Sequence, residues 1–232
     1  MEPTELFVPE VGGIKPVDFR GEYEFTHDGW PGTLTLHAQA GRSMRGSYRD
    51  NRFSQTFVVI GQVDPEVRHR ISFAIRDFNW LDEQQFVGYL FTRGRQEFAG
   101  TTLWKEEPFG FVARKASSLA LGTYRTGGVE PSDFAGRYDI HHDGWSGTLD
   151  LEHQGGRGLT GRYHQESLGR DLTVEGEVDP VVRHAVSLRF TGDMRLAAIR
   201  LTGYLFTRPK NAVAGVIEGP AGPTGFYMVK RG

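Results

Sequence analysis

Two stretches of the 232-residue chain decide the fold: FRGEYEFTHDGWPGTLTL at residues 19–36 and FAGRYDIHHDGWSGTLDL at residues 134–151. They lie 115 positions apart, and the same offset aligns Phe19–Lys115 with Phe134–Lys230 without a gap. A repeat of this length has the size of an ordinary domain. The sequence therefore predicts two copies of one complete folding unit, because duplication of half a core would leave apolar faces uncovered.

Each copy is a series of short stretches in which apolar and polar residues alternate, separated by Gly, Asp or Pro, which is typical of β-strands. The Asp28-Gly29 pair predicts a tight hairpin, because both residues tolerate positive φ. The short connections make sequential strands antiparallel neighbours, and eight such strands close without an exposed edge. We expect the strands of the first copy at Phe19–Phe25, Thr33–Ala38, Met44–Asp50, Thr56–Val63, His69–Phe78, Gln84–Thr92, Glu97–Trp104 and Gly110–Lys115.

The predicted fold class is therefore all-β, with two tandem eight-stranded antiparallel up-and-down β-barrels. We place the first barrel at residues 18–115 and the second at residues 133–232. Residues 1–17 form an N-terminal lead-in rich in Pro and Gly. Residues 116–132 form a linker, whose Leu119 and Leu121 either make a helical turn or pack between the barrels.

The composition argues against several classes of protein. Lys and Arg number 27 against 29 Asp and Glu, with no basic cluster, so neither nucleic acid nor a membrane is an expected partner. There is no cysteine, and the eight histidines show no HExxH pattern, so we expect no metal and no other cofactor. The N-terminus lacks the pattern of a signal peptide, and no apolar segment is long enough to span a membrane. We therefore expect a soluble cytoplasmic protein.

Four motifs recur at corresponding places in both copies, and together with the strand plan they resemble the avidin and streptavidin family of eight-stranded barrels. They are a Gly-x-Tyr first strand, a Gly-hydroxyl pair after the first turn, a Gly-x-Tyr third strand and the seventh strand. The first copy has them at Gly21-Glu22-Tyr23, Gly32-Thr33, Gly46-Ser47-Tyr48 and Ala99–Trp104, and the second at Gly136-Arg137-Tyr138, Gly147-Thr148, Gly161-Arg162-Tyr163 and Ala214–Gly219.

The resemblance implies a ligand pocket inside each barrel. It gives Thr33 and Thr148 the place of the family's ureido-binding hydroxyl, and Tyr48 and Tyr163 the place of its ureido-binding tyrosine. Other positions depart from the family and argue against biotin itself. These are Asp50 and Gln165 in place of a hydroxyl, Phe25 and Ile140 in place of an asparagine, and Phe111 and Phe226 in place of a buried aspartate. The aromatic walls Trp104 and Trp80 of the first copy correspond to Gly219 and Arg195 in the second.

The hairpin motif His27-Asp28-Gly29-Trp30 and its twin His142-Asp143-Gly144-Trp145 are unusual, because a tight turn requires neither His nor Trp. An exposed Trp beside these polar groups would stack on a sugar or another flat ligand. The alternative, which the sequence favours, is structural: Trp30 covers the barrel end and His27 hydrogen-bonds the turn. Asp64-Pro65 with Arg68 and His69 is likewise interpreted as a turn with an Asp–Arg ion pair rather than as an acid–base pair.

Three functions fit these residues. The sequence favours a protein that binds a small organic molecule or a carbohydrate in the first barrel, beside Thr33, Tyr48, Asp50, Trp80 and Trp104. An enzyme of cyclase or isomerase type would use Tyr48 and Asp50 as acid and base, but no nucleophile with its own base is evident. A scaffold or inhibitor would act through its loops. Such chains are also compatible with a homodimer.

Overall fold

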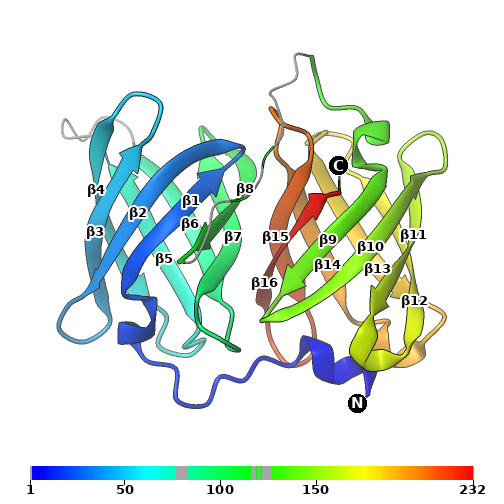
Figure 1. Ribbon diagram of the computed structural model, residues 1–232, viewed down its shortest axis with the longest axis horizontal. Coiled ribbons are helices and arrows are strands. Elements are labelled where there is room, and N and C mark those ends of the chain that lie inside the picture. The colour runs from blue at the N-terminus through cyan, green and yellow to red at the C-terminus, as the bar shows by residue number, and fades with distance from the viewer. Residues whose placement is uncertain (1, 77–82, 116–118, 120, 122–126, 232) are drawn as a thin grey trace.

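The computed structural model describes residues 2–76, 83–115, 119, 121 and 127–231. Its strands form two closed, eight-stranded antiparallel barrels in tandem (Figure 1), which confirms the predicted fold class. The first barrel consists of β1 (Gly21–His27), β2 (Trp30–Ala38), β3 (Ser43–Asp50), β4 (Gln55–Val63), β5 (Arg70–Arg76), β6 (Glu83–Leu90), β7 (Glu97–Trp104) and β8 (Glu107–Arg114). The second consists of β9 (Gly136–His142), β10 (Trp145–His153), β11 (Gly158–Gln165), β12 (Arg170–Val178), β13 (Ala185–Thr191), β14 (Arg200–Leu205), β15 (Ala212–Glu218) and β16 (Thr224–Lys230).

Each barrel closes where its first strand pairs with both its second and its last strand, β1 with β2 and β8, and β9 with β10 and β16. Alternate side chains point inward, as the period of two requires. The first interior is rich in aromatic rings, from Phe25, Phe73, Phe86, Phe98 and Phe111. The second interior has Ile140, Leu188, Leu201, Val213 and Phe226 at the corresponding positions. Both middles are packed with side chains, so any ligand site must lie toward an end.

Several observed strand ends differ from the predicted ones, by at most three residues in the described part of the chain. Phe19 lies in a 3-10 turn, η2 (Pro16–Phe19), because Pro16 starts the turn and the Asp18 side chain accepts a hydrogen bond from the Lys15 backbone N–H. Strand β2 starts three residues earlier than expected, at Trp30. Strand β8 starts at Glu107, because the turn before it needs only Lys105 and Glu106, both with positive φ. The predicted end of the fifth strand at Phe78 lies outside the described residues.

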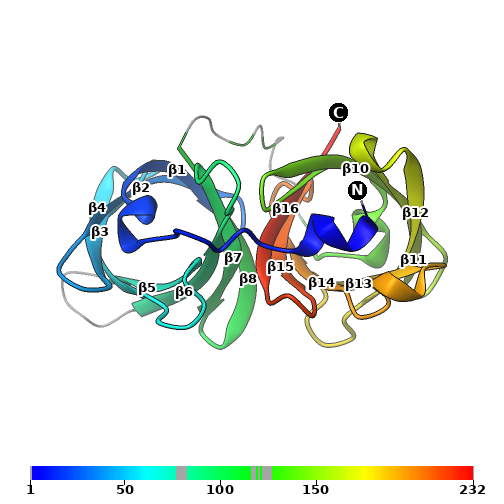
Figure 2. The same cartoon turned by 90° about the horizontal axis from the view of Figure 1, so that it is seen from below.

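The N-terminal lead-in runs from the end of the first barrel across to the second (Figure 2). It carries the 3-10 turn η1 (Pro3–Phe7), whose Leu6 and Phe7 belong to the core of the second barrel. The remaining short turns are η3 (Pro131–Phe134), the twin of η2, η4 (Glu166–Leu168) and η5 (Met194–Leu196). No helix in the described part of the chain is long and apolar enough to cross a membrane.

The barrels pack side by side through a junction in which several contacts have a twin at the offset of 115 residues. Asp28, in the β1–β2 turn, accepts hydrogen bonds from the backbone N–H and the hydroxyl of Thr207 at 2.6 and 2.8 Å. Asp143 accepts the same two hydrogen bonds from Thr92. The junction therefore has the reciprocal form of a two-fold symmetric dimer interface, built inside one chain.

Two further pairs of contacts repeat this symmetry. The His69 Nε2 donates to the Pro223 carbonyl at 2.7 Å, and His184 Nε2 donates to the Pro108 carbonyl at 2.7 Å. A Cβ on Gly110 would lie 2.5 Å from the Ala214 carbonyl oxygen, and a Cβ on Gly225 would lie 2.4 Å from that of Ala99. Glycine is required at both positions because the backbones of the two barrels approach so closely.

An apolar cluster fills the centre of the junction. It consists of Phe91, Ala99, Val112, Phe206, Ala212, Ala214 and Tyr227. Leu119 and Leu121 of the linker pack against it, which answers the question of where these two side chains lie. The two-fold arrangement also makes the two barrels antiparallel. The β1–β2 turn therefore lies at one end of the molecule and the β9–β10 turn at the other (Figure 1).

Loss of either junction carboxylate should destabilise the protein. We expect Asp28→Ala and Asp143→Ala each to lower the free energy of unfolding by about 2–4 kcal/mol, because each leaves a buried N–H and a hydroxyl without an acceptor. Urea denaturation measures this change. The control Asp150→Ala removes an exposed carboxylate 3.6 Å from Arg137 and should cost less than about 0.5 kcal/mol. Equal losses in all three variants would contradict this account of the junction.

Candidate functional site

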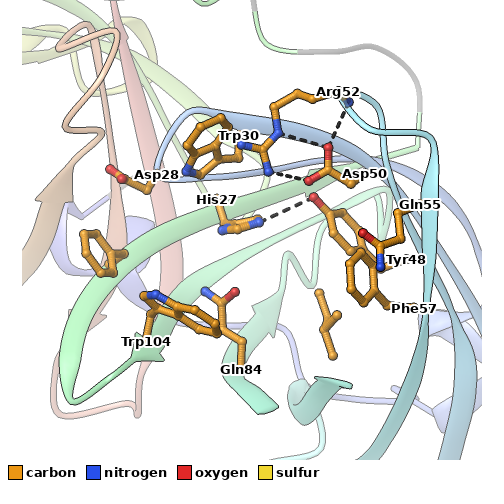
Figure 3. Close-up of a pocket in the computed structure, with 12 residues that line it drawn as sticks. His27, Asp28, Trp30, Tyr48, Asp50, Arg52, Gln55, Phe57, Gln84 and Trp104 are labelled. Carbon is orange, nitrogen blue, oxygen red and sulfur yellow. Dashed lines mark hydrogen bonds and ion pairs between the residues drawn. The ribbon is translucent and has the colours of Figure 1, made fainter. Parts of the chain in front are cut away.

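A cavity of about 470 Å³ opens at the end of the first barrel where β1 meets β2 (Figure 3). We call this end the first mouth, and the corresponding end of the second barrel, where β9 meets β10, the second mouth. Side chains from β1–β8 and their turns converge on the cavity. Its lining consists of His27, Asp28, Trp30, Tyr48, Asp50, Arg52, Gln55, Phe57, Ile75, Gln84, Trp104 and Phe109.

His27 and Tyr48 form the floor of the first mouth. His27 is the last residue of β1 and Tyr48 comes from β3, and the Tyr48 hydroxyl lies 3.4 Å from His27 Nε2. Burial, with a smaller contribution from the nearby Arg52 charge, lowers the pKa of His27 to about 4, so its imidazole is neutral at neutral pH. Burial raises the pKa of Tyr48 above its ordinary value. The floor is therefore an uncharged pair of hydrogen-bonding rings.

The glycine of the Gly-hydroxyl pair has a clear structural role in this floor. A Cβ on Gly32 would lie 2.1 Å from the ring of Tyr48, so only glycine lets that ring lie against β2. Its twin Gly147 has the same relation to Tyr163, at 2.8 Å. The close approach of the Tyr ring thus explains why the glycine of the pair recurs in both copies.

One side of the mouth carries an ion pair. The Arg52 backbone N–H and Nε both donate to Asp50 Oδ1, at 2.8 and 2.9 Å, and a second guanidinium nitrogen contacts Oδ2. Burial raises the pKa of the Asp50 carboxyl, but the Arg52 hydrogen bonds and charge outweigh it and hold that pKa below its ordinary value. The Arg52 guanidinium lies 3.2 Å from the centre of the Trp30 ring, and Arg208 of the second barrel lies 3.6 Å from the same ring. The opposite charges of Asp50 and Arg52 neutralise each other.

The rest of the lining is mostly apolar. Phe57, Ile75 and Phe109 contribute hydrocarbon surface, and Trp104 stands at the rim with 37% of its surface exposed. Between them, the Gln84 amide donates to the Thr102 hydroxyl at 3.0 Å, which leaves its carbonyl oxygen available as an acceptor. The first mouth therefore combines flat apolar walls with a few oriented polar groups, the usual composition of a small-molecule site.

The second mouth has the same floor but is filled by the chain itself. His142 Nε2 lies 2.9 Å from the Tyr163 hydroxyl, and burial lowers the pKa of His142 to about 3, with help from His141 and Arg93. Phe7 of the lead-in covers this pair: its ring lies 5.1 Å from that of His142 and nearly parallel to it, at 9°. Phe7 is only 3% exposed. The lead-in therefore closes the mouth of the second barrel.

Polar contacts hold the lead-in in place on both sides of Phe7. The Glu10 backbone N–H donates to the Thr92 hydroxyl at 2.7 Å, and Arg93 donates to the Val8 carbonyl and pairs with Glu10 at 3.1 Å. At the other end of the segment Glu2 pairs with Arg195 of η5. These contacts hold the segment across the second mouth on both sides of Phe7.

The structure brings together many of the residues that the sequence suggested. Tyr48, Asp50 and Trp104 line the same cavity as His27, Asp28 and Trp30. Asp28 also bridges the barrels, as does its twin Asp143, a role that a local reading of the turn does not reveal. Trp30 lies between Arg52 and Arg208, and Trp145 has Arg93 at 4.9 Å from its ring.

Other suggested residues lie elsewhere. Thr33 alternates on β2 with the core residues Leu34 and Leu36, so its side chain is on the outer face. Its twin Thr148 lines a surface groove with His164 and Arg231. The geometry therefore gives no support to the hydroxyl role implied by the avidin resemblance. Trp80 lies outside the described residues.

The Asp64-Pro65 turn differs from expectation in its charge partner. The Asp64 side chain accepts hydrogen bonds from the backbone N–H groups of Glu66 and Val67, as a turn residue does, and it lies 3.5 Å from Arg70 rather than pairing with Arg68. In the described part of the chain, no three His, Asp or Glu side chains come close enough together to hold a metal ion.

Two contributors were missed from the sequence. Arg52 lies in a polar turn, and only its position two residues after Asp50 indicates that it could fold back on that carboxylate. Phe7 lies in a segment rich in Pro and Gly, and the apolar run Leu6-Phe7-Val8 there is a signal of a docking segment. The second signal does not identify the surface on which the segment docks.

Acid should weaken the fold through the two floor histidines. Their pKa values in the folded protein are about 4 and about 3, against 6.5 for a free imidazole. The stability that they contribute is complete above pH 6.5 and is lost as the pH falls toward these values, because only the unfolded chain takes up the proton. For each of the two histidines, the free energy of unfolding should fall by about 2 kcal/mol between about pH 7.5 and about pH 5.

Urea denaturation of His142→Gln at both pH values checks this expectation. The variant should lose about 2 kcal/mol less than the unchanged protein over that interval. The control His37→Gln makes the same substitution at an exposed position of β2. A pH dependence in His142→Gln equal to that of the unchanged protein would refute the assignment.

Comparison with known proteins does not assign the chain to a family. No family model and no curated protein matches it. Among solved structures, a Nostoc punctiforme protein of unknown function from the DUF3598 family is 10% identical over 93% of this chain and 97% of that one, with a TM-score of 0.32. Intact Ap-TbpB, with its N and C lobes, is 10% identical over 86% of this chain and 66% of that one, with a TM-score of 0.28.

Proposed function

We propose that this protein binds one small, uncharged organic molecule in the first mouth, while the second barrel is a structural partner closed by the lead-in. The observation that carries the proposal is the difference between two mouths with the same His–Tyr floor. One holds the Phe7 ring, and the other, among the described residues, is a cavity of about 470 Å³. That volume falls within the range of small-molecule sites.

The electrostatics of the first mouth favour a neutral ligand. Asp50 is paired with Arg52, and His27 is neutral at neutral pH. A charged ligand would lose its hydration without gaining a free counter-ion in the cavity. Oriented acceptors, such as the Gln84 carbonyl and the Asp50 carboxylate, instead suit a ligand with N–H or O–H groups.

The same groups disfavour catalysis by Tyr48 and Asp50 as acid and base. An acid–base catalyst works best with a pKa near the operating pH. Burial moves the pKa of Tyr48 further above that range, and the Arg52 contacts move the pKa of Asp50 further below its ordinary value. Ligand binding, in contrast, requires neither Tyr48 nor Asp50 to change its protonation state.

A carbohydrate is the second candidate ligand. Trp104 stands exposed at the rim, and Gln84 and Gln55 line the same cavity, so a sugar ring stacked on Trp104 would find amide partners. This candidate differs from the first in its position, because it places the ligand at the rim rather than on the His27–Tyr48 floor.

Protein-observed NMR with a library of small neutral molecules and simple sugars tests the proposal. We expect the compounds that bind to shift signals of Phe57, Ile75 and Trp104, at one site per chain. Shifts confined to Trp104 and caused by sugars alone would favour the carbohydrate candidate. Binding that maps only to other surfaces, or no binding by any compound, would refute the proposal.

A filled-mouth variant gives the matching control. Ile75→Trp adds bulk where the wall lines the cavity and should abolish binding without unfolding the barrel. Val181→Trp adds the same side chain at a position of the second barrel that is 85% exposed and should leave binding unchanged. Unaltered binding by Ile75→Trp would exclude the first mouth as the site.

A further inference from the structure

In the second mouth, the Phe7 side chain occupies the place that a bound ligand would take. Its ring stacks on the face of His142 at 5.1 Å and 9°, and it meets Phe190 at 5.1 Å and 50°. The ring reaches this position from a segment outside the barrel, so no strand geometry forces it there. The face of the imidazole is thus a place where a separate aromatic ring packs well in this fold.

The corresponding place in the first mouth is built from the same parts. His27 and Tyr48 correspond to His142 and Tyr163, and Ile75 corresponds to Phe190 at the offset of 115 residues. Among the described residues, the rings beside His27 belong to Phe25, Tyr48 and Phe86, and they meet it tilted or edge-on, at 41°, 67° and 86°. None of them takes the parallel position that Phe7 takes on His142.

The sequence of the linker agrees with this difference. At the same offset, Phe7 corresponds to Gly122, which has no side chain to offer, although its position lies outside the described residues. Both mouths therefore keep the same floor residues, whereas the position of Phe7 carries a ring in the lead-in and no side chain in the linker.

We infer that the ligand of the first mouth carries a planar aromatic or heteroaromatic ring with N–H or O–H groups, stacked on His27 as Phe7 stacks on His142. This inference rests on the proposed function and narrows its ligand class. The hydrogen-bonding groups follow from the exchanges around the floor: Asp50, Arg52 and Gln84 stand where the second copy has Gln165, Ser167 and Ile199. A phenyl ring alone suits the second mouth, and a ring with polar edges suits the first.

A matched pair of probes, 3-phenylpropanamide and 3-cyclohexylpropanamide, tests the inference in NMR titrations of the unchanged protein. They share the amide and the chain length, and the cyclohexyl compound is the more apolar. We expect the phenyl compound to bind the first mouth about three- to tenfold more tightly, because ring stacking adds to burial. It should also shift the His27 ring protons upfield, which a saturated ring does not do.

The Phe7→Ala variant supplies an internal positive control. Removing the ring should open a second site, so that the phenyl compound also shifts His142 ring protons. Binding of the phenyl compound at His142 in this variant, but not at His27, would overturn the inference about the first mouth. Equal binding of both probes at the first mouth without a His27 shift would also overturn it, while leaving small-molecule binding there intact. Binding of neither probe at the first mouth would overturn it as well, and the compound library decides the proposed function separately.

Discussion

The reciprocal hydrogen bonds of Asp28 with Thr207 and of Asp143 with Thr92 are the constraint on which the rest of the structure depends. They fix each β-hairpin of one barrel on a turn of the other, and burial raises the pKa of both carboxyls even though the threonines stabilise the charged form. Because the contacts are two-fold related, the two barrels are antiparallel to each other. The two mouths consequently open at opposite ends of the molecule (Figure 1).

This arrangement explains why only one mouth is closed by the lead-in. The lead-in joins the first barrel at η2, which lies at the end opposite the first mouth. Because the barrels are antiparallel, the second mouth lies beside that same end (Figure 2). The segment therefore reaches His142 within a few residues and is held there through Thr92 and Arg93, next to the junction. One polar contact surface thus organises both the pairing of the barrels and the closure of the second.

The two copies also show how a duplicated barrel diverges. Their floors, His27–Tyr48 and His142–Tyr163, keep the same residue types and a hydrogen-bonding contact. Around the first floor stand Asp50, Gln84 and Trp104, where the second copy has Gln165, Ile199 and Gly219. Phe7 covers the second floor. Because Phe7 already fills the second mouth, our proposal assigns ligand binding to the first barrel and a structural role to the second.

Much of the fold was predictable because its signals are local or repeated. The gapless offset predicts two units, and alternation with short turns predicts eight antiparallel strands in each. The same alternation places Thr33 on the outer face, since Leu34 and Leu36 must point inward, and the analogy with avidin obscured this. The junction could not be predicted, because Asp28 and Thr207 have no sequence relation beyond both belonging to repeated motifs. The closure of the second mouth by Phe7 could not be predicted either, since no sequence pattern links Phe7 to His142.

The central claim is that the lead-in fills one mouth and leaves its twin for a ligand. A nuclear Overhauser spectrum of the unliganded protein, with the aromatic rings labelled, tests it most directly. The account predicts cross-peaks from the Phe7 ring protons to the rings of His142 and Phe190, and cross-peaks from His27 to Phe25, Tyr48 and Phe86. Absence of the Phe7–His142 cross-peaks, or a cross-peak from Phe7 to His27, would contradict it.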